Sequence, residues 1–250
     1  MDKLYDVLIW GASLKGLEKA IELKEKGHQV LVMNKFGFPG GNPAESLSCL
    51  FPVETDGGDS FRARFLEDLS NLRYGRVYSG HREQLFHPEA FKRVGWETIG
   101  NHDLEVLFHV MPLDMERKDD RVSLTLFGRE GTFEIQGREM MDCSDNHFLA
   151  GFLDEKVSYD GQIRLHCFFK SMTPEMEADF AFERTISTAI GTYSMLQLKD
   201  VAYDDIERQF NMWLDRLAIE GWRKYGVRML IMPVYPELLF ANLSNTDDHV

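Results

Sequence analysis

The chain has few cysteines and no long apolar run, and these absences exclude several classes of protein. Its three cysteines, Cys49, Cys143 and Cys167, are far apart, odd in number and without a CxxC pair, which argues against a disulfide framework and a zinc finger. No apolar stretch approaches the ~18 residues needed to span a bilayer. The start, MDKLYDVLIW, leads into a Gly-rich turn rather than a signal-peptide cleavage site. We therefore expect a soluble, cytoplasmic protein without a membrane partner.

Positive charge is also scarce. Lys and Arg total 28 of the 250 residues against 41 Asp and Glu, which gives a formal net charge of −13, and no basic block occurs. Such a chain is a poor non-specific ligand for nucleic acid, so we expect no nucleic-acid partner. The length allows one large domain or two smaller ones, at roughly 100–200 residues per domain.

Several catalytic signatures are missing as well. Neither a GxSxG nor a P-loop pattern occurs, so hydrolase and NTPase functions have no support. The histidines show no HxxxH or HxH spacing, and we predict no metal site and solvated or capping roles for them. They are His28, His81, His87, His102, His109, His147, His166 and His249.

The clearest local pattern is a strand, a turn, a helix and a second strand. Short apolar runs at 5–10 and 29–34 flank a segment, 14–26, whose apolar residues recur at helical spacing. Gly27 stands where a helix C-terminal cap belongs. An apolar strand, a crossover helix and another apolar strand are typical of a parallel sheet, so we predict parallel neighbouring strands with a right-handed crossover.

The rest of the chain predicts an α/β fold with a parallel sheet, an antiparallel β-meander at about 104–136, and a smaller α+β region. We expect one domain at 1–152 and a second, for a substrate or an interaction, at 153–250. Helices are expected at 61–72, from Pro88 onward, at 146–152 and at 204–224. Strands are expected at 104–110, 122–127, 132–136, 139–143, 163–169, 227–234 and 238–243.

The strongest functional motif is G-A-S-L-K-G at residues 11–16, directly after a strand and opening a helix. In a dinucleotide-binding fold, the first Gly makes the tight turn, the second lets backbone approach a pyrophosphate and the third lets helix pack close to strand. Here Ser13 holds the second position, and its hydroxyl is a candidate phosphate donor. Asn34 ends the second strand where a carboxylate usually accepts the ribose hydroxyls. Lys35 beside it keeps NADP open as a minor alternative.

Three segments resemble FAD-dependent oxidoreductases of the glutathione-reductase-like superfamily. VLIWGASLKGLEKAIELKEKGHQVLVMNKFGFPGG is similar to their opening, with its Rossmann turn, second strand and Gly-Gly loop. HPEAFKR followed by LEVLFHV resembles the helix and strand before their meander, and MDCSDNHFLAG resembles their closing segment. The resemblance covers roughly residues 4–152. It implies a Rossmann-like FAD/NAD(P)-binding domain, FAD as cofactor and flavin-mediated hydride or electron transfer on an unknown small molecule.

The departures from the family pattern keep a second interpretation open. Asn34 replaces the usual acidic residue, and Ser144, Asp145 and Asn146 stand where Thr, Gly and Asp are expected. Asp145 places a negative charge near the expected pyrophosphate, which is unfavourable unless the loop points it away. No returning Gly-rich segment follows Ser171. The chain is therefore either an oxidoreductase or a non-catalytic relative or partner subunit. A partner chain or a second copy is expected to complete the flavin site.

The resemblance assigns no catalytic residue. The residues that it places at the cofactor, here called the candidate cofactor site, are Gly11, Ala12, Ser13, Gly16, Asn34, Lys35, Gly40, Gly41, Ser144 and Asp145.

Overall fold

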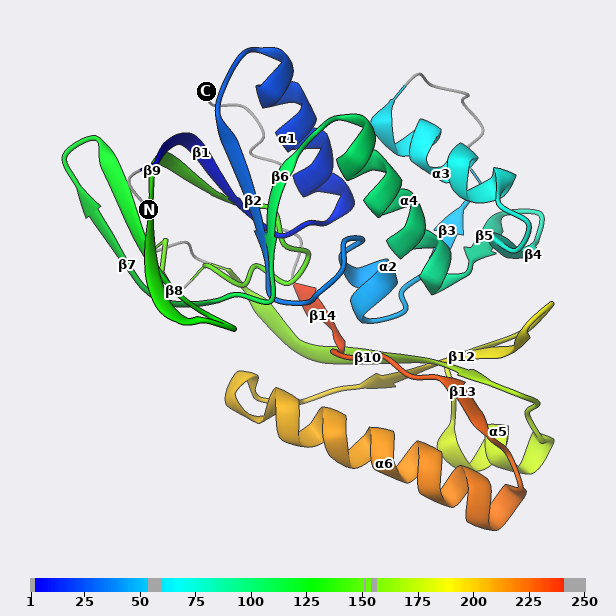
Figure 1. The fold of residues 1–250 in the computed structure, drawn as a ribbon. Helices are drawn as coiled ribbons and strands as arrows, with labels where there is room; N and C mark the ends of the chain where they lie inside the picture. Colours follow the sequence, from blue (N-terminus) through cyan, green and yellow to red (C-terminus); the bar gives the residue numbers. More distant parts are fainter. Residues whose placement is uncertain (1–2, 54–59, 151, 154–156, 241–250) are drawn as a thin grey trace. The chain divides into compact units, whose positions relative to one another are not determined.

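A computed structural model describes residues 3–53, 60–150, 152–153 and 157–240 of the chain (Figure 1). The fold is mixed α/β, as the sequence predicts, with one mixed sheet and two antiparallel sheets. The chain divides into two compact units. Unit 1 contains residues 1–44, 54–75 and 87–156, and unit 2 contains residues 45–53, 76–86 and 157–250.

Unit 1 is built on a six-stranded sheet in the order β6-β2-β1-β9-β8-β7. Its parallel part consists of β6 (Glu105–Phe108), β2 (Val30–Asn34), β1 (Leu4–Trp10) and β9 (Gly131–Asp142). The predicted strand–helix–strand unit is confirmed, because β1 and β2 are parallel neighbours joined by α1 (Leu14–Glu25). Gly27 follows this helix with a φ of +89°, the conformation expected of its cap.

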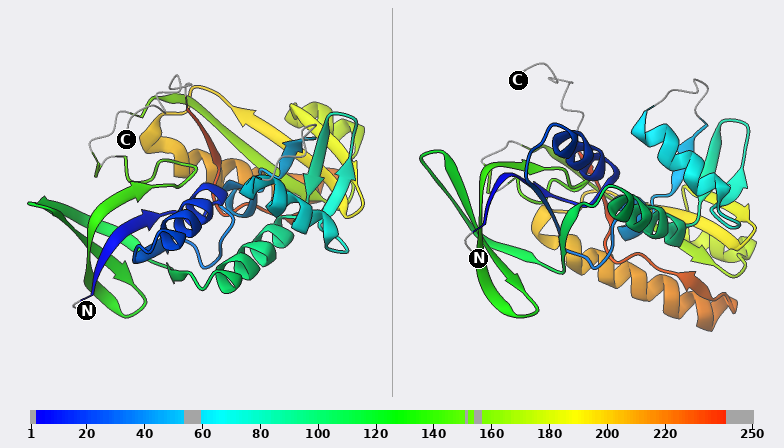
Figure 2. Two further views of the ribbon diagram at one scale, coloured as in Figure 1. Left: turned by 90° about the horizontal axis from the view of Figure 1, so that it is seen from above. Right: turned by 45° about the horizontal axis from the view of Figure 1, so that its top comes forward.

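Both faces of the parallel strands are covered. Val7 and Ile9 of β1 pack with Ala20 and Leu23 of α1 on one face, and the alternate residues of β1 pack toward the meander on the other. This alternation follows from the period of two along a strand. Helix α4 (Pro88–Asn101) lies beside α1 on the same side of the sheet and contacts α3 (Phe61–Asn71), as two views show (Figures 1 and 2).

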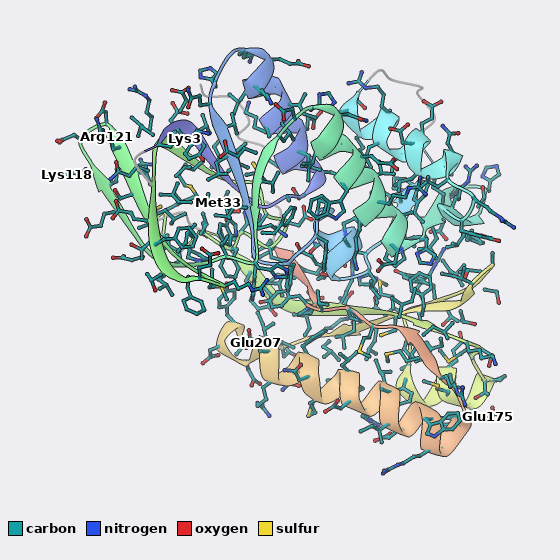
Figure 3. The ribbon with its side chains drawn as sticks, in the orientation of Figure 1. Lys3, Met33, Lys118, Arg121, Glu175 and Glu207 are labelled. Atoms are coloured by element: carbon teal, nitrogen blue, oxygen red, sulfur yellow. The ribbon has the colours of Figure 1, made fainter. Side chains whose placement is uncertain are left out.

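The meander begins later than the sequence predicts. It consists of β7 (Met111–Lys118), β8 (Arg121–Gly128) and the first part of β9, whereas the run at 104–110 contains the parallel edge strand β6. The expected turn at Asp119-Asp120 is confirmed. Lys118 of β7 and Arg121 of β8 lie opposite each other beside it as partners in the two strands (Figure 3). The expected strands at 132–136 and 139–143 are one continuous strand. The expected helix at 146–152 is a series of turns in its described residues.

The main sheet of unit 2 is antiparallel, with the order β11-β12-β10-β13 and β14 paired to β10. Its strands are β10 (Tyr159–Phe169), β11 (Arg184–Thr188), β12 (Gly191–Leu198), β13 (Met229–Ile231) and β14 (Glu237–Phe240). Three helical segments complete this region: α5 (Pro174–Phe180), the short 3-10 helix η1 (Tyr203–Asp205) and α6 (Ile206–Tyr225). Glu175 and Glu207 mark the first turns of α5 and α6 (Figure 3).

The two faces of β10 have different neighbours. Ile163, Leu165 and Cys167 enter an apolar core together with Phe210 and Leu217 of α6. The residues between them in the strand point to the opposite face, because successive side chains of a strand alternate. This opposite face therefore carries the polar part of the strand.

The division of the chain differs from the single boundary expected near residue 152. Three short strands, β3 (Leu50–Pro52), β4 (Arg76–Ser79) and β5 (Glu83–Phe86), form a separate antiparallel sheet in the order β3-β5-β4 and group with unit 2. The four-residue helix α2 (Asn42–Glu45) precedes them. Such pairing between distant segments has no local sequence signal.

Among the described residues, no helix has both the length and the apolar character required to cross a membrane.

Candidate functional site

Three segments far apart in sequence converge at the carboxyl ends of β1, β2 and β9. The turn after β1 is joined to β2 by a hydrogen bond from Gly11 N to Met33 O, at 2.7 Å, and Met33 is labelled in Figure 3. The segment after β9 is joined to β1 by a bond from Cys143 N to Trp10 O, at 2.8 Å. The Gly-Gly loop is joined to the turn by a bond from Gly40 N to Ala12 O, at 2.8 Å. All ten residues of the candidate cofactor site lie in these segments.

The turn at residues 11–16 requires its two glycines. Gly11 has a φ of +101°, and a Cβ there would lie 2.6 Å from Ser144 N. A Cβ at Gly16 would lie 1.9 Å from the carbonyl oxygen of Gly11. The first glycine thus permits the tight turn, and the last permits close contact between helix and turn, as the motif predicts.

Ser13 caps helix α1. Its Oγ accepts a hydrogen bond from Gly16 N, at 3.1 Å, and donates one to Cys143 O, at 2.6 Å. The single hydroxyl proton is therefore used within the protein, so the hydroxyl is not a phosphate donor in this conformation. The first amides of a helix have no intrahelical acceptor, and they remain the groups suited to an anion at this position.

Asn34 ties the turn to the loop that follows β2. It is buried, and its Oδ1 accepts a hydrogen bond from Ala12 N, at 3.2 Å. Its Nδ2 donates to Phe38 O, at 3.0 Å, and to Phe36 O, at 3.3 Å. Both amide hydrogens are thus used within the protein. A ribose hydroxyl would have to donate to the second lone pair of Oδ1.

Asp145 closes on the Gly-Gly loop. Its Oδ2 accepts a hydrogen bond from Asn42 N, at 2.6 Å. A Cβ at Gly41 would lie 2.3 Å from this same oxygen and 2.8 Å from Ser13 Cβ. The loop therefore comes very near both the turn and the closing segment, and it is a glycine that allows this approach. The carboxylate of Asp145, which we expected near a pyrophosphate, points at the backbone N–H of Asn42.

The closing segment is organised by Asp142, a residue that the sequence reading missed. Its Oδ1 accepts hydrogen bonds from Ser144 N, at 2.8 Å, and Ser144 Oγ, at 2.6 Å, and its Oδ2 accepts one from Leu149 N, at 2.6 Å. Ser144 Oγ in turn accepts a bond from Phe148 N, at 2.9 Å. A carboxylate at a strand end, followed by Ser two residues later, is the signal that would have indicated this turn.

Two aromatic rings and a lysine border the same segments. Phe148 stacks on Trp10, with ring centroids 5.6 Å apart. The ammonium of Lys35 lies 5.2 Å from the Phe148 ring and 5.6 Å from the Phe36 ring. Lys35 is the one cationic side chain of the candidate cofactor site, and it lies over these rings.

Cys143 does not contribute a reactive thiol. It is buried against the turn, and burial raises its pKa to about 11. The thiolate is the reactive form of cysteine, so a thiol with this pKa is inert at neutral pH. Its backbone, which binds Trp10 and Ser13, is the part that shapes the site.

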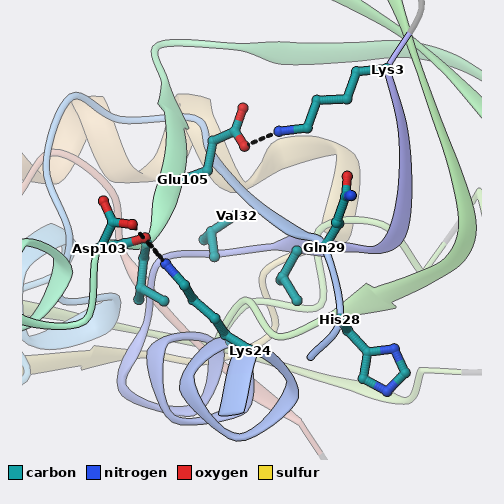
Figure 4. A pocket seen from close by; sticks show the side chains of 10 residues that line it. Lys3, Lys24, His28, Gln29, Val32, Asp103 and Glu105 are labelled. Carbon is teal, nitrogen blue, oxygen red and sulfur yellow. Dashed lines mark hydrogen bonds and ion pairs between the residues drawn. The ribbon is translucent and has the colours of Figure 1, made fainter. Parts of the chain in front are cut away.

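A cavity of about 420 Å³ in unit 1 lies at the amino ends of the parallel strands (Figure 4). Its charged side chains are paired: Lys3 with Glu105, and Lys24 with Asp103 at 3.1 Å. Ligands of open parallel sheets bind at the carboxyl ends of the strands. This cavity therefore lies at the wrong edge for a dinucleotide. No cluster of three or more metal-ligating side chains occurs within the described ranges.

The fold and the site together define a Rossmann-type dinucleotide-binding domain. A scan against family models matches residues 6–161 to "FAD dependent oxidoreductase". The chain belongs to the FAD-dependent oxidoreductase family. FAD is the cofactor of that family, and the resemblance proposed from the sequence is confirmed at this level. A comparison with curated protein sequences gives no match.

Solved structures of low sequence identity share the fold. OxyS anhydrotetracycline hydroxylase from Streptomyces rimosus has a TM-score of 0.60 and 15% identity over 95% of this chain and 52% of its own. p-Nitrophenol 4-monooxygenase PnpA from Pseudomonas putida DLL-E4 has a TM-score of 0.59 and 13% identity over 96% of this chain and 69% of its own. A flavoprotein/dehydrogenase from Cytophaga hutchinsonii has a TM-score of 0.58 and 16% identity over 96% of this chain and 67% of its own. The chain thus spans about half to two thirds of these proteins.

Proposed function

We propose that this chain is an FAD-dependent oxidoreductase that binds the ADP portion of FAD at the candidate cofactor site and acts on a small aromatic compound. The observation that carries the proposal is the convergence of the turn at 11–16, the loop at 40–41 and the segment at 144–145 within the part of the chain that matches the family. FAD, when bound, supplies the redox chemistry.

The backbone of the turn fits the cofactor better than its side chains do. Gly11 and Gly16 let the turn close on Ser144 and on the start of the helix, where a Cβ would clash with backbone atoms. The helix N-terminus offers N–H groups and the positive end of a dipole to phosphates. Ser13 and Asn34 act by holding this backbone in place. Gly40 and Gly41 let the neighbouring loop come near. The protein's part is therefore to bind and orient, through a rigid turn.

The aromatic substrate class is supported by the names of the structural relatives. Two of them are named as hydroxylases or monooxygenases of aromatic compounds, and a third structure is an aklavinone-11 hydroxylase with FAD and aklavinone, with a TM-score of 0.55 and 13% identity over 96% of this chain and 55% of its own. The names of these relatives favour an aromatic hydroxylase. They do not favour the glutathione-reductase-like branch that the sequence suggested.

The test is turnover. The full chain with added FAD is expected to oxidise NADH or NADPH faster when an aromatic compound from a phenol panel is present, and to convert that compound. The matched control is Gly16→Ala, which should reduce FAD retention and turnover together. FAD binding without any nicotinamide oxidation across the panel would contradict the enzymatic part of the proposal.

A non-catalytic relative remains the second candidate, and one contact favours it. The carboxylate of Asp145 accepts from Asn42 N beside Gly41, where an anionic cofactor would approach. Asp145→Asn keeps an acceptor for that bond and removes the charge. If wild type fails to bind FAD and Asp145→Asn binds it, the non-catalytic reading is supported. Equal binding by both proteins would contradict it.

We also propose that a partner chain or a second copy completes the flavin site, and that the protein is cytoplasmic, as the sequence predicts. Sedimentation of the full chain with and without FAD tests the first point, since a completed site would make association depend on the cofactor. Cell fractionation tests the second.

A further inference from the structure

The sheet of unit 2 has its polar contacts on the face away from α6. His166 Nδ1 lies 2.7 Å from Tyr193 Oη, and His166 Nε2 lies 2.9 Å from Glu237 Oε2. His166 is buried, so it is neither solvated nor a helix cap, which corrects the expectation from the sequence. These groups find their partners within the sheet, whereas α6 on the other face carries side chains that do not.

Helix α6 has apolar residues on two opposite sides. One side, which includes Phe210 and Leu217, packs into the core of unit 2. On the other side, Met212, Ile219 and Trp222 are 47%, 48% and 51% exposed. They follow one another at seven and three positions, and these spacings return a helical residue to nearly the same face. These three side chains are here called the α6 stripe.

The α6 stripe stands where a surface helix is usually charged and polar. Single exposed apolar side chains are common on proteins and need no explanation. Three in line along one helix form a strip, and contiguous apolar surface of this kind marks an interaction site. Figure 1 shows α6 lying along one side of β10 and β12, so its outer side is the one that carries the stripe.

The two ends of α6 carry opposite charge. Residues 203–209 contain three acidic side chains and one basic side chain, whereas residues 221–228 contain three basic side chains and no acidic one. The charged side chains of these two ends that make no ion pair with any described residue are Asp204 and Glu207 at the first end and Arg223 and Arg228 at the second. The unpaired charges are thus negative at one end and positive at the other.

The other charged groups at the ends do not cancel this pattern. Asp205 is paired with Arg208, and Lys224 is paired with Asp179 of α5 at 2.6 Å. The helix macrodipole adds roughly half a positive charge at the N-terminus and half a negative charge at the C-terminus. This is less than the two unpaired side-chain charges at each end. The helix therefore presents an acidic end and a basic end with the α6 stripe between them.

A surface with this pattern is complementary to a second copy of itself. A two-fold axis can lay two copies of a helix antiparallel, so that the acidic end of each lies over the basic end of the other. A parallel arrangement would bring like charges together. The chain has a formal net charge of −13, so two copies repel each other over most of their surface. The mixed charges of α6 avoid this repulsion.

We propose that two copies of this chain associate through their α6 helices, which lie antiparallel about a two-fold axis. Met212 of one copy packs against Trp222 of the other, where a thioether and an aromatic ring make a favourable contact. The two Ile219 side chains lie near the axis, and Asp204 of each copy lies near Arg228 of the other. The interface is formed by unit 2 alone, so it rests neither on the proposed function nor on bound FAD.

The interface is small. Helix α6 has 20 residues, so it is roughly 30 Å long. Two helices that pair along this length bury less than the roughly 800 Å² per partner of a standard stable interface. We therefore expect a weak dimer, with a Kd of roughly 1–100 μM, whose population depends on protein concentration.

Sedimentation equilibrium of the full chain without FAD tests the association. Wild type should pass from monomer to dimer as its concentration rises from about 1 to about 300 μM. Ile219→Glu should weaken the dimer at least about tenfold, because it places two carboxylates near the axis. Glu is a good helix former, so circular dichroism should show an intact helix in this variant. Leu113→Glu, at a leucine of β7 that is 52% exposed, is the matched control and should dimerise like wild type.

Two results would overturn the α6 interface. The first is a wild-type chain that stays monomeric up to about 300 μM, or that dimerises as well as Ile219→Glu does. The second is a dimer that forms only with FAD and survives Ile219→Glu, since that dimer would belong to the flavin site. The proposed function stands or falls by FAD binding and turnover, so its outcome is separate.

Cross-linking tests the antiparallel arrangement. A mixture of Met212→Cys and Trp222→Cys, treated with a short bifunctional maleimide, should give a covalent dimer, because the two positions meet across the axis. Each variant alone should give little, because its two cysteines lie roughly 15 Å apart along the paired helices. The native cysteines are buried, and wild type gives their background. Efficient cross-linking of either variant alone, with none gained on mixing, would overturn the antiparallel interface.

Discussion

Replacing Gly16 by Ala tests the turn most sharply. The added carbon would lie 1.9 Å from Gly11 O, 3.1 Å from Gly11 C and 3.4 Å from Cys143 Cβ. Non-bonded heavy atoms rest about 3.5 Å apart, so the turn must move by more than about 1 Å. Overpacking costs roughly 1–3 kcal/mol, and the better helix propensity of Ala offsets at most about 1 kcal/mol. We expect a net loss of about 1–2 kcal/mol of stability.

The same displacement moves the helix amides away from a bound phosphate. Loss of one charge-assisted hydrogen bond, roughly 1.5–3 kcal/mol, corresponds to about tenfold to a hundredfold in FAD affinity. The measurements are urea unfolding and FAD fluorescence titration. Gly100→Ala in α4 is the matched control, because its Cβ meets nothing within 4 Å, and it should be neutral or stabilising. Wild-type stability and affinity in Gly16→Ala would refute the reasoning.

Three further predictions concern the hydrogen bonds of Asn34, the burial of two cysteines and the ionisation of Glu237. Asn34→Glu, the family-like residue, should lower the free energy of unfolding by about 1–3 kcal/mol in urea melts, because it has no donors for two loop carbonyls; unchanged stability would contradict this. Cys143 and Cys167, whose pKa values burial raises to about 11 and about 12, should resist iodoacetamide at pH 8 until the protein unfolds; rapid native labelling would show the contrary. The lowered pKa of Glu237 contributes stability that is complete above its ordinary value of 4.5 and is lost as the pH falls through its folded value. In Glu237→Gln, the free energy of unfolding should therefore fall less steeply than in wild type as the pH is lowered below 4.5. The same pH dependence in both proteins would argue against it.

Local sequence was sufficient for the first strand–helix–strand unit, because both of its strands are apolar and its turn is marked by two glycines. It failed at β9, where two strands, 132–136 and 139–143, are expected and one continuous strand, Gly131–Asp142, is found. A Cβ at Gly137 would lie 2.6 Å from Leu8 Cγ, so this glycine lets the strand continue against β1. Strand β7 was missed because, at the edge of the sheet, half of its residues are exposed and polar.

The sequence predicts which segments approach one another at the candidate cofactor site, but not the contacts within it. The turn motif singles out Gly11, and the family resemblance singles out Gly41. Both glycines lie beside the closing segment. The hydrogen bonds of Asn34 and Asp142 depend on which backbone groups the fold brings within reach, and no spacing rule contains that information. His166 was misjudged for the same reason, since its partners come from two other strands.

Direct titration of the full chain with FAD tests the central claim, with calorimetry or flavin fluorescence as the readout. The account predicts saturable one-to-one binding that Gly16→Ala weakens at least tenfold and Gly100→Ala leaves unchanged. Absence of binding at high micromolar FAD, or equal binding by wild type and Gly16→Ala, would contradict it.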